Sequence, residues 1–134
     1  MKIVTWNVNS INARIEHLIR FIKEDKSDIY LIQELKCINE SFPYKEIKRL
    51  GYESYVNGQK AWNGVAILSK YKISIENDKL PTYKEDIQAR FLETNIKINL
   101  IKKPIKLFCI YLPNGNPIDS EKFDYKIKWM KKFN

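Results

Sequence analysis

The first 34 residues constrain the fold most, because two short apolar segments flank an amphipathic helix. Lys2–Val8 and Asp28–Glu34 are almost continuously apolar, as buried strands are. Between them, apolar residues recur at helical spacing over residues 12–25. This order predicts two parallel strands joined by a right-handed crossover. Asn7 and Glu34 are then expected at the same carboxyl edge of a sheet.

The remaining pattern predicts a single α/β domain. Further elements are expected as strands at Tyr52–Val56, Gly64–Ser69, Tyr71–Ile75, Gln88–Ile98 and Ile105–Leu112, the last two joined by a Lys-Lys-Pro loop, with a short helix between Pro43 and Gly51 and a final helix capped by Ser120. In the final helix Phe123, Ile127 and Met130 share one stripe. Helices can cover only one face of strands that are apolar on both faces. We therefore expect one mixed sheet with helices on one face, an exposed apolar face opposite, and poor solubility as a monomer.

The charge of the chain suits a partner that carries phosphates. The formal net charge is +8, from 24 basic and 16 acidic residues. Residues 101–134 hold eight Lys against three acidic residues, so the excess is C-terminal. The abundance of Lys, Ile and Asn is also what AT-rich coding produces, so charge alone is weak evidence for nucleic-acid binding.

Cysteine usage and hydropathy indicate the compartment. Cys37 and Cys109 lie in unrelated segments, without the spacing of a zinc site. No segment resembles a signal peptide or approaches the length needed to span a bilayer. We expect a cytoplasmic protein with no membrane association.

Polar residues follow four of the expected strands. Ligands of open α/β sheets gather outside the carboxyl ends of strands, so these residues are candidates for a site. They are Asn7 and Asn9 after the first strand, Glu34 and Lys36 after the second, Gln88 and Arg90 beside the sixth, and Tyr111 and Asn114 after the seventh. A carboxylate beside amides suits Mg²⁺, which is often held by one or two carboxylates plus substrate phosphate. Glu34 is the one acidic member of the set.

Each of these residues also has a purely structural interpretation. Glu34 could be a solvated strand end, Asn7 could form an Asx turn, and Arg90 could pair with a surface carboxylate. Tyr111 could be a core tyrosine. Trp62 and Trp129 could stack on bases, although aromatic residues at such positions are usually core. His17 falls off the apolar stripe of its helix and is expected to face solvent, without a catalytic part.

Six segments, taken in order, resemble the N-terminal half of the exonuclease III family of apurinic/apyrimidinic endonucleases, within the endonuclease/exonuclease/phosphatase superfamily. They are KIVTWNVNSINAR, IQELK, LGYESYVNGQKAWNGVAILSK, QARFLE, YLPNGNP and KFDYKIKWM. The resemblance spans essentially the whole chain. It implies the N-terminal half of a four-layer sandwich, in which each half contributes one sheet and its helices. Residues 1–134 would then form an incomplete domain.

The resemblance also implies roles for individual residues. Glu34 would bind Mg²⁺, or Mn²⁺ in its place, together with Asn7, and Tyr111 and Asn7 would act on the scissile phosphate. The remaining candidates would contact DNA, namely Asn9, Lys36, Gln59, Arg90 and Asn114. The second half of such proteins carries a Gly-Asp-x-Asn motif and a closing Asp-His pair, and neither occurs here.

Three functions remain open from the sequence. The first is an exodeoxyribonuclease III-type DNA repair enzyme that cleaves double-stranded DNA at abasic sites and 3′ ends, active only with a complementary, separately encoded C-terminal half. The second is a non-catalytic remnant that binds nucleic acid weakly through its basic C-terminal helix. The third is a phosphodiesterase of phosphoinositides, which QKAWNGVAILSK and YLPNGNP disfavour.

Overall fold

A computed structural model describes residues 1–98 and 103–134. The elements in chain order are β1 (Ile3–Asn7), the short 3₁₀ turn η1 (Asn12–Arg14), α1 (Ile15–Asp25), β2 (Ile29–Gln33), the 3₁₀ turn η2 (Asn39–Ser41), α2 (Tyr44–Arg49), β3 (Glu53–Asn57), β4 (Val65–Ser69), β5 (Ile73–Asn77), β6 (Phe91–Ile96), β7 (Ile105–Ile110) and α3 (Glu121–Phe133). Every expected strand and helix is therefore present. The expected Lys-Lys-Pro loop begins at Lys102, which lies outside the described residues.

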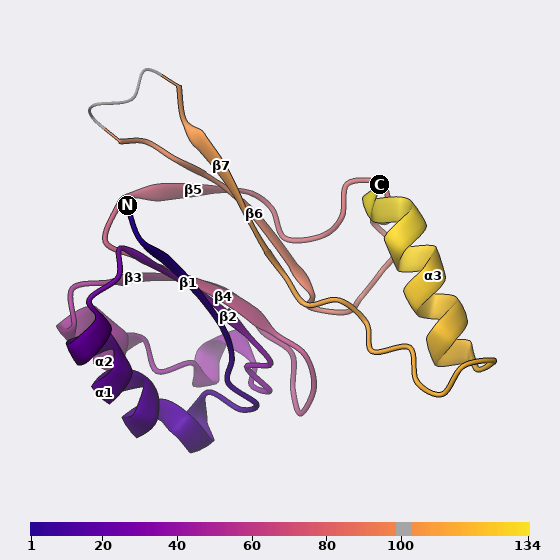
Figure 1. The fold of residues 1–134 in the computed structure, drawn as a ribbon, viewed down its shortest axis with the longest axis horizontal. Coiled ribbons are helices and arrows are strands. Elements are labelled where there is room, and N and C mark those ends of the chain that lie inside the picture. Colours follow the sequence, from indigo (N-terminus) through magenta and orange to yellow (C-terminus); the bar gives the residue numbers. More distant parts are fainter. Residues whose placement is uncertain (99–102) are drawn as a thin grey trace.

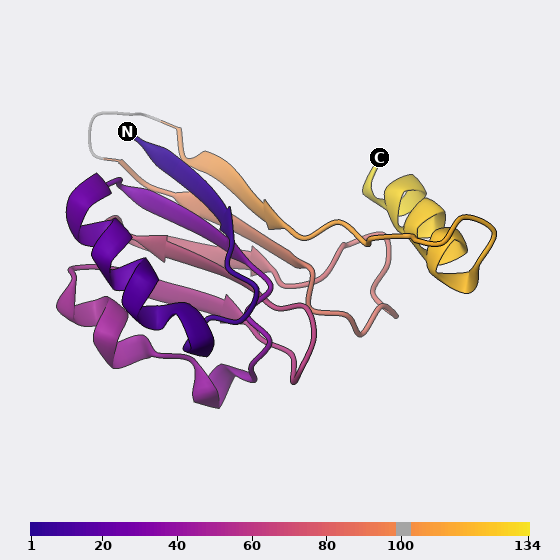
Figure 2. The ribbon, with the colours of Figure 1, turned by 60° about the horizontal axis from the view of Figure 1, so that its bottom comes forward.

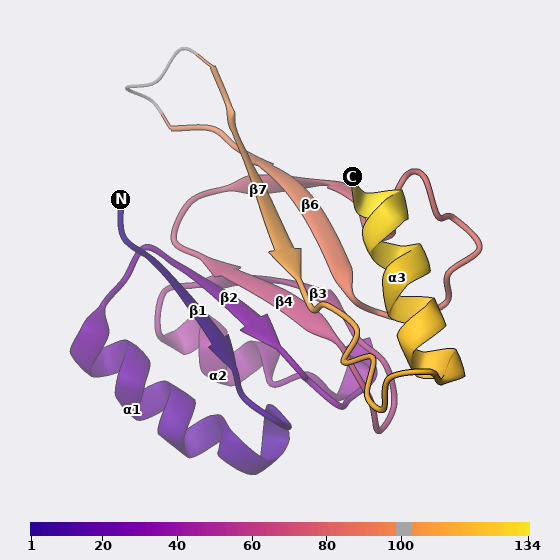
Figure 3. The same cartoon turned by 45° about the vertical axis from the view of Figure 1, so that its right-hand side comes forward.

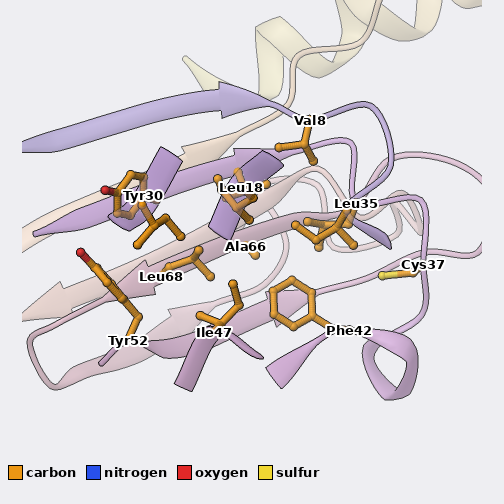
Figure 4. Close-up of a cluster of buried hydrophobic side chains, with 13 residues drawn as sticks. Val8, Leu18, Tyr30, Leu35, Cys37, Phe42, Ile47, Tyr52, Ala66 and Leu68 are labelled. Carbon is orange, nitrogen blue, oxygen red and sulfur yellow. The ribbon is translucent and has the colours of Figure 1, made fainter. Parts of the chain in front are cut away.

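The first sheet has the order β1-β2-β4-β3 and is mixed (Figure 1). β1 and β2 are parallel, as predicted, while β4 runs antiparallel to both of its neighbours. α1 and α2 cover one face of this sheet, and the core between them is drawn in Figure 4. Leu18 of α1, Ile47 of α2 and Leu68 of β4 are fully buried there. The mixed sheet with helices on one face is confirmed.

The prediction of one sheet is wrong, because β5, β6 and β7 form a second, antiparallel sheet. This sheet packs against the face of the first sheet that the helices leave open (Figure 2). Ile29 and Ile67 of the first sheet meet Leu92 and Cys109 of the second in one buried cluster. The apolar face that we expected to be exposed is thus covered within the chain, since two sheets can bury their inner faces against each other.

On the same side of the molecule, each sheet ends in a strand that has a neighbour on one side only. β1 and β7 are edge strands, and β7 packs over β2, the neighbour of β1. Ile3 is 40% exposed and Phe108 is 39% exposed. The expectation that the first strand is buried on both faces is therefore wrong, because an edge strand lacks a neighbour and is covered less.

α3 lies beyond the end of the strands, next to the chain that leads into β6 (Figure 3). Ser120 caps it, as predicted, by accepting a hydrogen bond from the backbone N–H of Phe123. The expected stripe is only partly buried: Phe123 and Ile127 are half-buried and Met130 is 45% exposed, while Trp129 is buried against Leu80 and Tyr83. The indole is the largest of these four α3 side chains, so its burial removes more apolar surface from water than burial of any single one of the other three would. Within the described residues, no helix has the length and apolar character needed to cross a membrane.

Candidate active site

Three strand ends meet at the carboxyl edge of the first sheet. Asn7 ends β1, Glu34 follows β2 and Tyr111 follows β7. The Asn7 side-chain amide donates to Glu34 Oε1 at 2.8 Å, and the Tyr111 hydroxyl donates to the same oxygen at 2.7 Å. The predicted meeting of Asn7 and Glu34 is confirmed. Tyr111, 77 residues away from Glu34 in sequence, joins them because β7 packs over β2.

The backbone around these residues is held in left-handed conformations. Asn9, Ser10, Glu34 and Lys36 all have φ between 46° and 85°. Such values are uncommon outside glycine and often mark functional sites. Backbone bonds fix them, since the Ser10 N–H donates to the Glu34 carbonyl at 2.8 Å and the Lys36 N–H donates to the Asn63 carbonyl at 2.9 Å. The carboxylate is therefore presented by a rigid crossing of two loops.

Gly64 supports this crossing from the adjacent strand. The Leu35 N–H donates to the Gly64 carbonyl at 3.2 Å. Gly64 has φ +88°, and a Cβ there would lie 2.8 Å from the Cβ of Leu35. Only glycine fits this position, because both the backbone angle and the space exclude a side chain.

One cation borders the carboxylate, and a second lies at the neighbouring Asn9. Lys36 Nζ lies 3.2 Å from Glu34 Oε2 and also donates to the side-chain oxygen of Asn9. The Arg14 guanidinium donates to the backbone carbonyl of Asn9. Asn9 also donates its N–H to the side-chain oxygen of Asn7 at 3.1 Å, which closes the Asx turn considered from the sequence.

The electrostatics keep Glu34 ionised. Burial alone would raise the pKa of Glu34, but the hydrogen bonds from Asn7, Tyr111 and Lys36 outweigh it and hold that pKa below its usual value. Burial raises the pKa of Tyr111, and the bond to Glu34 raises it further, so the phenol stays protonated and able to donate. An anionic acceptor and a neutral donor therefore share one site at neutral pH.

The donor set fits a cation that keeps most of its water. Among residues 1–98 and 103–134, no three His, Cys, Asp or Glu side chains gather as a metal cage. Glu34 supplies one carboxylate, whose second oxygen lies 3.2 Å from the Lys36 ammonium. Mg²⁺ is commonly held by one or two carboxylates together with water and substrate phosphate, and this arrangement matches that pattern.

Gln59 has its side chain occupied inside the protein. Its Oε1 accepts hydrogen bonds from the Asn63 side chain at 3.0 Å and from the Ala89 N–H at 2.9 Å. Asn63 also donates to the side-chain oxygen of Gln88. These bonds join loop 58–64 to loop 86–90. Contact of Gln59 with DNA stays a prediction, and the geometry gives it a positioning role.

Arg90 and Asn114 lie at a hollow of about 380 Å³ beside Tyr111. Asn114 is exposed, and its side-chain oxygen accepts a hydrogen bond from Asn116 at 2.8 Å. Asn7 and Asn9 line a second hollow, of about 550 Å³, on the other side of Glu34. The candidate residues thus form one continuous edge, with Glu34 between two open depressions.

The sequence did not single out several residues at this edge. Arg14 reaches Asn9 from the helical turn, and Lys122 and Tyr125 come from α3. Trp62 was left open between core and surface, and it is 69% exposed. His17 is exposed, as expected, and lines the larger hollow. The basic, aromatic composition of KFDYKIKWM was the available signal for Lys122 and Tyr125.

Comparison with known proteins shows which family and which relatives the chain is similar to. Residues 4–125 match the model of the Endonuclease/Exonuclease/phosphatase family. Exodeoxyribonuclease III of Haemophilus influenzae is 34% identical over 97 residues, which make up 72% of this chain and 36% of that protein.

Solved structures agree over nearly the whole chain. A 3′ phosphatase, NExo, from Neisseria, bound to a product DNA hairpin, superposes with a TM-score of 0.88 at 33% identity, covering 98% of this chain and 49% of that one. An AP endonuclease from Archaeoglobus fulgidus gives a TM-score of 0.81 at 36% identity with the same coverage. The chain therefore spans about half the length of the solved proteins it matches, and it corresponds to the N-terminal half of their fold.

Proposed function

The chain belongs to the endonuclease/exonuclease/phosphatase family, and we propose on that basis that it carries one part of the active site of a Mg²⁺-dependent DNA repair phosphodiesterase. The observation that carries this proposal is the Glu34 carboxylate, held ionised by Asn7, Tyr111 and Lys36 where three strands end. The substrates would be double-stranded DNA with abasic sites or 3′ ends. The DNA-bound Neisseria relative supports this class of substrate.

Each residue at the edge has a task in this proposal. Glu34 would hold the cation, Mg²⁺ or Mn²⁺, with the side-chain oxygen of Asn7 beside it. The bound cation would neutralise charge that develops on phosphate oxygens. The protonated Tyr111 hydroxyl is placed to donate to a phosphate oxygen, and Lys36, Asn9 and Asn114 offer further contacts to the DNA backbone. Arg90 and Gln59 complete the DNA-facing edge.

The described residues supply only part of the chemistry. Attack of water on phosphorus needs a base to orient and deprotonate the water. Glu34 is engaged by its partners Asn7, Tyr111 and Lys36, and in the part of the chain that the structure describes it belongs to no group of three or more His, Cys, Asp or Glu side chains. We therefore propose that activity requires the groups found in the other half of full-length relatives, whether joined to this chain or supplied separately.

The open edges of β1 and β7 support this requirement. They lie on the same side of the sandwich, with Ile3 and Phe108 partly exposed. A complementary half could extend both sheets at once by pairing with these edges. Pairing there would also bring its residues next to Asn7 and Tyr111, because both side chains stand at the ends of the edge strands.

Complementation tests the proposal. The chain is purified alone and mixed with the C-terminal half of the Archaeoglobus AP endonuclease, and cleavage of an abasic duplex is measured with Mg²⁺. We expect cleavage only in the mixture, and only when Glu34 is intact. Equal cleavage by the Glu34→Gln mixture would contradict the assigned role of Glu34. A covalent fusion of the two halves separates failure to associate from failure to react.

The second candidate, a non-catalytic nucleic-acid-binding protein, is favoured by one observation. α3 exposes Lys122, Lys128, Lys131 and Lys132. A salt-dependent gel shift that persists after Glu34→Gln, with no cleavage by either the mixture or the fusion, would favour this candidate.

A further inference from the structure

A hollow of about 380 Å³ lies next to Tyr111, between loop 58–64 and the N-terminal turn of α3. Its volume falls in the range of small-molecule sites. The side chains around it include Trp62 on one loop, Arg90 before β6 and Lys122 on α3. Because Tyr111 belongs both to this hollow and to the Glu34 cluster, a ligand in the hollow would lie beside the proposed scissile phosphate.

In the described part of the chain, Arg90 and Lys122 of this hollow form no ion pair. Arg90 Cζ stacks 4.9 Å from the ring centroid of Tyr111 and 5.7 Å from that of Tyr125. Its Nε is buried without a hydrogen-bond partner, and within residues 1–98 and 103–134 no carboxylate lies within 4.0 Å of Arg90 or Lys122. The nearby Asp86 is engaged by the Tyr125 hydroxyl at 2.8 Å. A guanidinium fixed between two rings and lacking a counter-ion is prepared for a phosphate.

The exposed indole offers a stacking surface at the rim of the same hollow. Trp62 is 69% exposed, although a large aromatic side chain normally buries most of its surface. Its neighbours Ala61 and Asn63 both have positive φ, and the Gln59 and Gln88 side chains hold Asn63. The backbone that carries the indole is therefore held in place, which lowers the entropic cost of stacking a ligand upon it.

We propose that this hollow binds one unstacked nucleotide of the DNA strand next to the scissile phosphate, with its base against Trp62 and its phosphate against Arg90 and Lys122. This inference rests on the proposed function for the position of the DNA. A nucleotide combines an aromatic face with an anionic group, and these are the two chemistries that the indole and the cations around this hollow would bind. Base stacking is tolerant of sequence, so the subsite would read the presence of a base and not its identity.

The test measures binding without metal, so that it is independent of cleavage. Fluorescence anisotropy compares two fluorescein-labelled duplexes in EDTA, one with a single-stranded 3′ overhang of ordinary nucleotides and one with an overhang of abasic residues. Trp62→Ala should weaken binding of the first probe about tenfold and leave the second within about twofold, as expected for one lost base stack. Trp62→Phe should keep most of the affinity. Phe133→Ala, at an exposed aromatic on the far end of α3, is the matched control and should change neither probe.

Two further variants test the phosphate contacts. Lys122→Ala should weaken both probes and reduce the slope of log affinity against log salt by about one, while Trp62→Ala leaves that slope unchanged. Arg90→Lys keeps the charge but removes the stacked plane, and it should weaken both probes.

The proposal is overturned if Trp62→Ala affects the two probes equally, if it affects neither, or if the wild-type chain binds neither probe. Any of these results leaves cleavage by the complemented protein, and hence the proposed function, to be judged on its own experiment.

Discussion

Two carboxylates stand at opposite ends of β2 and illustrate two uses of a polar cluster. Asp25 precedes the strand and accepts hydrogen bonds from the Ser27 N–H at 3.2 Å and the Tyr30 hydroxyl at 3.0 Å, with Lys2 also paired to it. Glu34 follows the strand and is bound by Asn7, Tyr111 and Lys36. In both cases hydrogen bonds lower the pKa of the carboxyl group.

The surroundings of the two carboxylates differ. Most partners of Asp25 come from the next five residues, and the buried rings of Tyr30 and Tyr52 close the cluster. The one left-handed residue nearby, Lys26, simply ends α1. The partners of Glu34 come from three separate strands, several of its neighbours have positive φ, and it lies between two hollows. We therefore expect Asp25 to stabilise the fold, and we propose that Glu34 serves a ligand.

The matched variants Glu34→Gln and Asp25→Asn test this difference between the two carboxylates, with the largest expected effect. In the complemented protein, Glu34→Gln should lower the rate of abasic-site cleavage by about 1,000-fold or more, because the cation loses its one carboxylate here. Its thermal unfolding midpoint should change little. Asp25→Asn should lower the unfolding midpoint and leave the rate near that of the wild type. If Asp25→Asn lowered the cleavage rate and Glu34→Gln lowered the unfolding midpoint, the roles assigned to the two carboxylates would be reversed.

The two tyrosines that contact these carboxylates give the next largest difference. Tyr111→Phe should reduce cleavage about 100-fold, as loss of a donor to a phosphate oxygen does. Tyr30→Phe should cost about 1–2 kcal/mol of unfolding free energy, because Ser27 and Asp25 lose a buried partner. Rates and urea unfolding of both variants provide the measurement. A rate loss in Tyr30→Phe, with Tyr111→Phe unaffected, would contradict the distinction.

Substitution of Gly64, beside the site, should cost more free energy of unfolding than substitution of Gly51, at the end of α2. Gly64→Ala should destabilise the fold by about 2–3 kcal/mol, because the backbone is left-handed and the new Cβ would meet Leu35. Gly51→Ala has a similar φ but nothing within 4 Å, so it should cost only about 1 kcal/mol. Urea unfolding measures both. Equal costs would mean that the close approach to Leu35 does not constrain the site.

The smallest expected effect is the pH dependence of the free energy of unfolding, compared between the wild type and Glu34→Gln. The folded pKa of Glu34 lies below its ordinary value of 4.5, so its stabilisation is complete above that value and is lost as the pH falls through the folded pKa. The free energy of unfolding of the wild type should exceed that of Glu34→Gln by about 1 kcal/mol or less at about pH 7, and this gap should close as the pH falls below the folded pKa of Glu34. A gap that widens in acid would show that folding disfavours the ionised form of Glu34, contrary to the lowered pKa.

The local pattern of apolar residues in the sequence was sufficient to predict much of the secondary structure. The apolar runs and the helical spacing located every strand and α-helix of the described residues, and the crossover rule brought Asn7 beside Glu34. Pairing between distant strands was not readable, because nothing in β5, β6 or β7 states whether they extend the first sheet or stack upon it. The second sheet, the open edge of β1 and the bond from Tyr111 to Glu34 all follow from that one missing fact.

The aromatic residues show a second limit. Trp62 and Trp129 have the same chemistry, yet one is exposed on a loop and the other is buried under α3. The loop bonds of Asn63 with Gln59 and Gln88 fix the first, and contact with Leu80 and Tyr83 fixes the second. Both depend on residues distant in sequence, so helical spacing alone singled out Phe123, Ile127 and Met130 and missed the buried Trp129.

A titration of the chain with Mn²⁺, followed by the broadening of backbone amide signals in NMR spectra, tests the contrast between the two carboxylates most directly. We predict broadening that begins at Asn7, Asn9 and Lys36, spares Ser27 and Tyr30, and disappears in Glu34→Gln. Broadening centred on the Asp25 cluster, or unchanged by Glu34→Gln, would contradict the account.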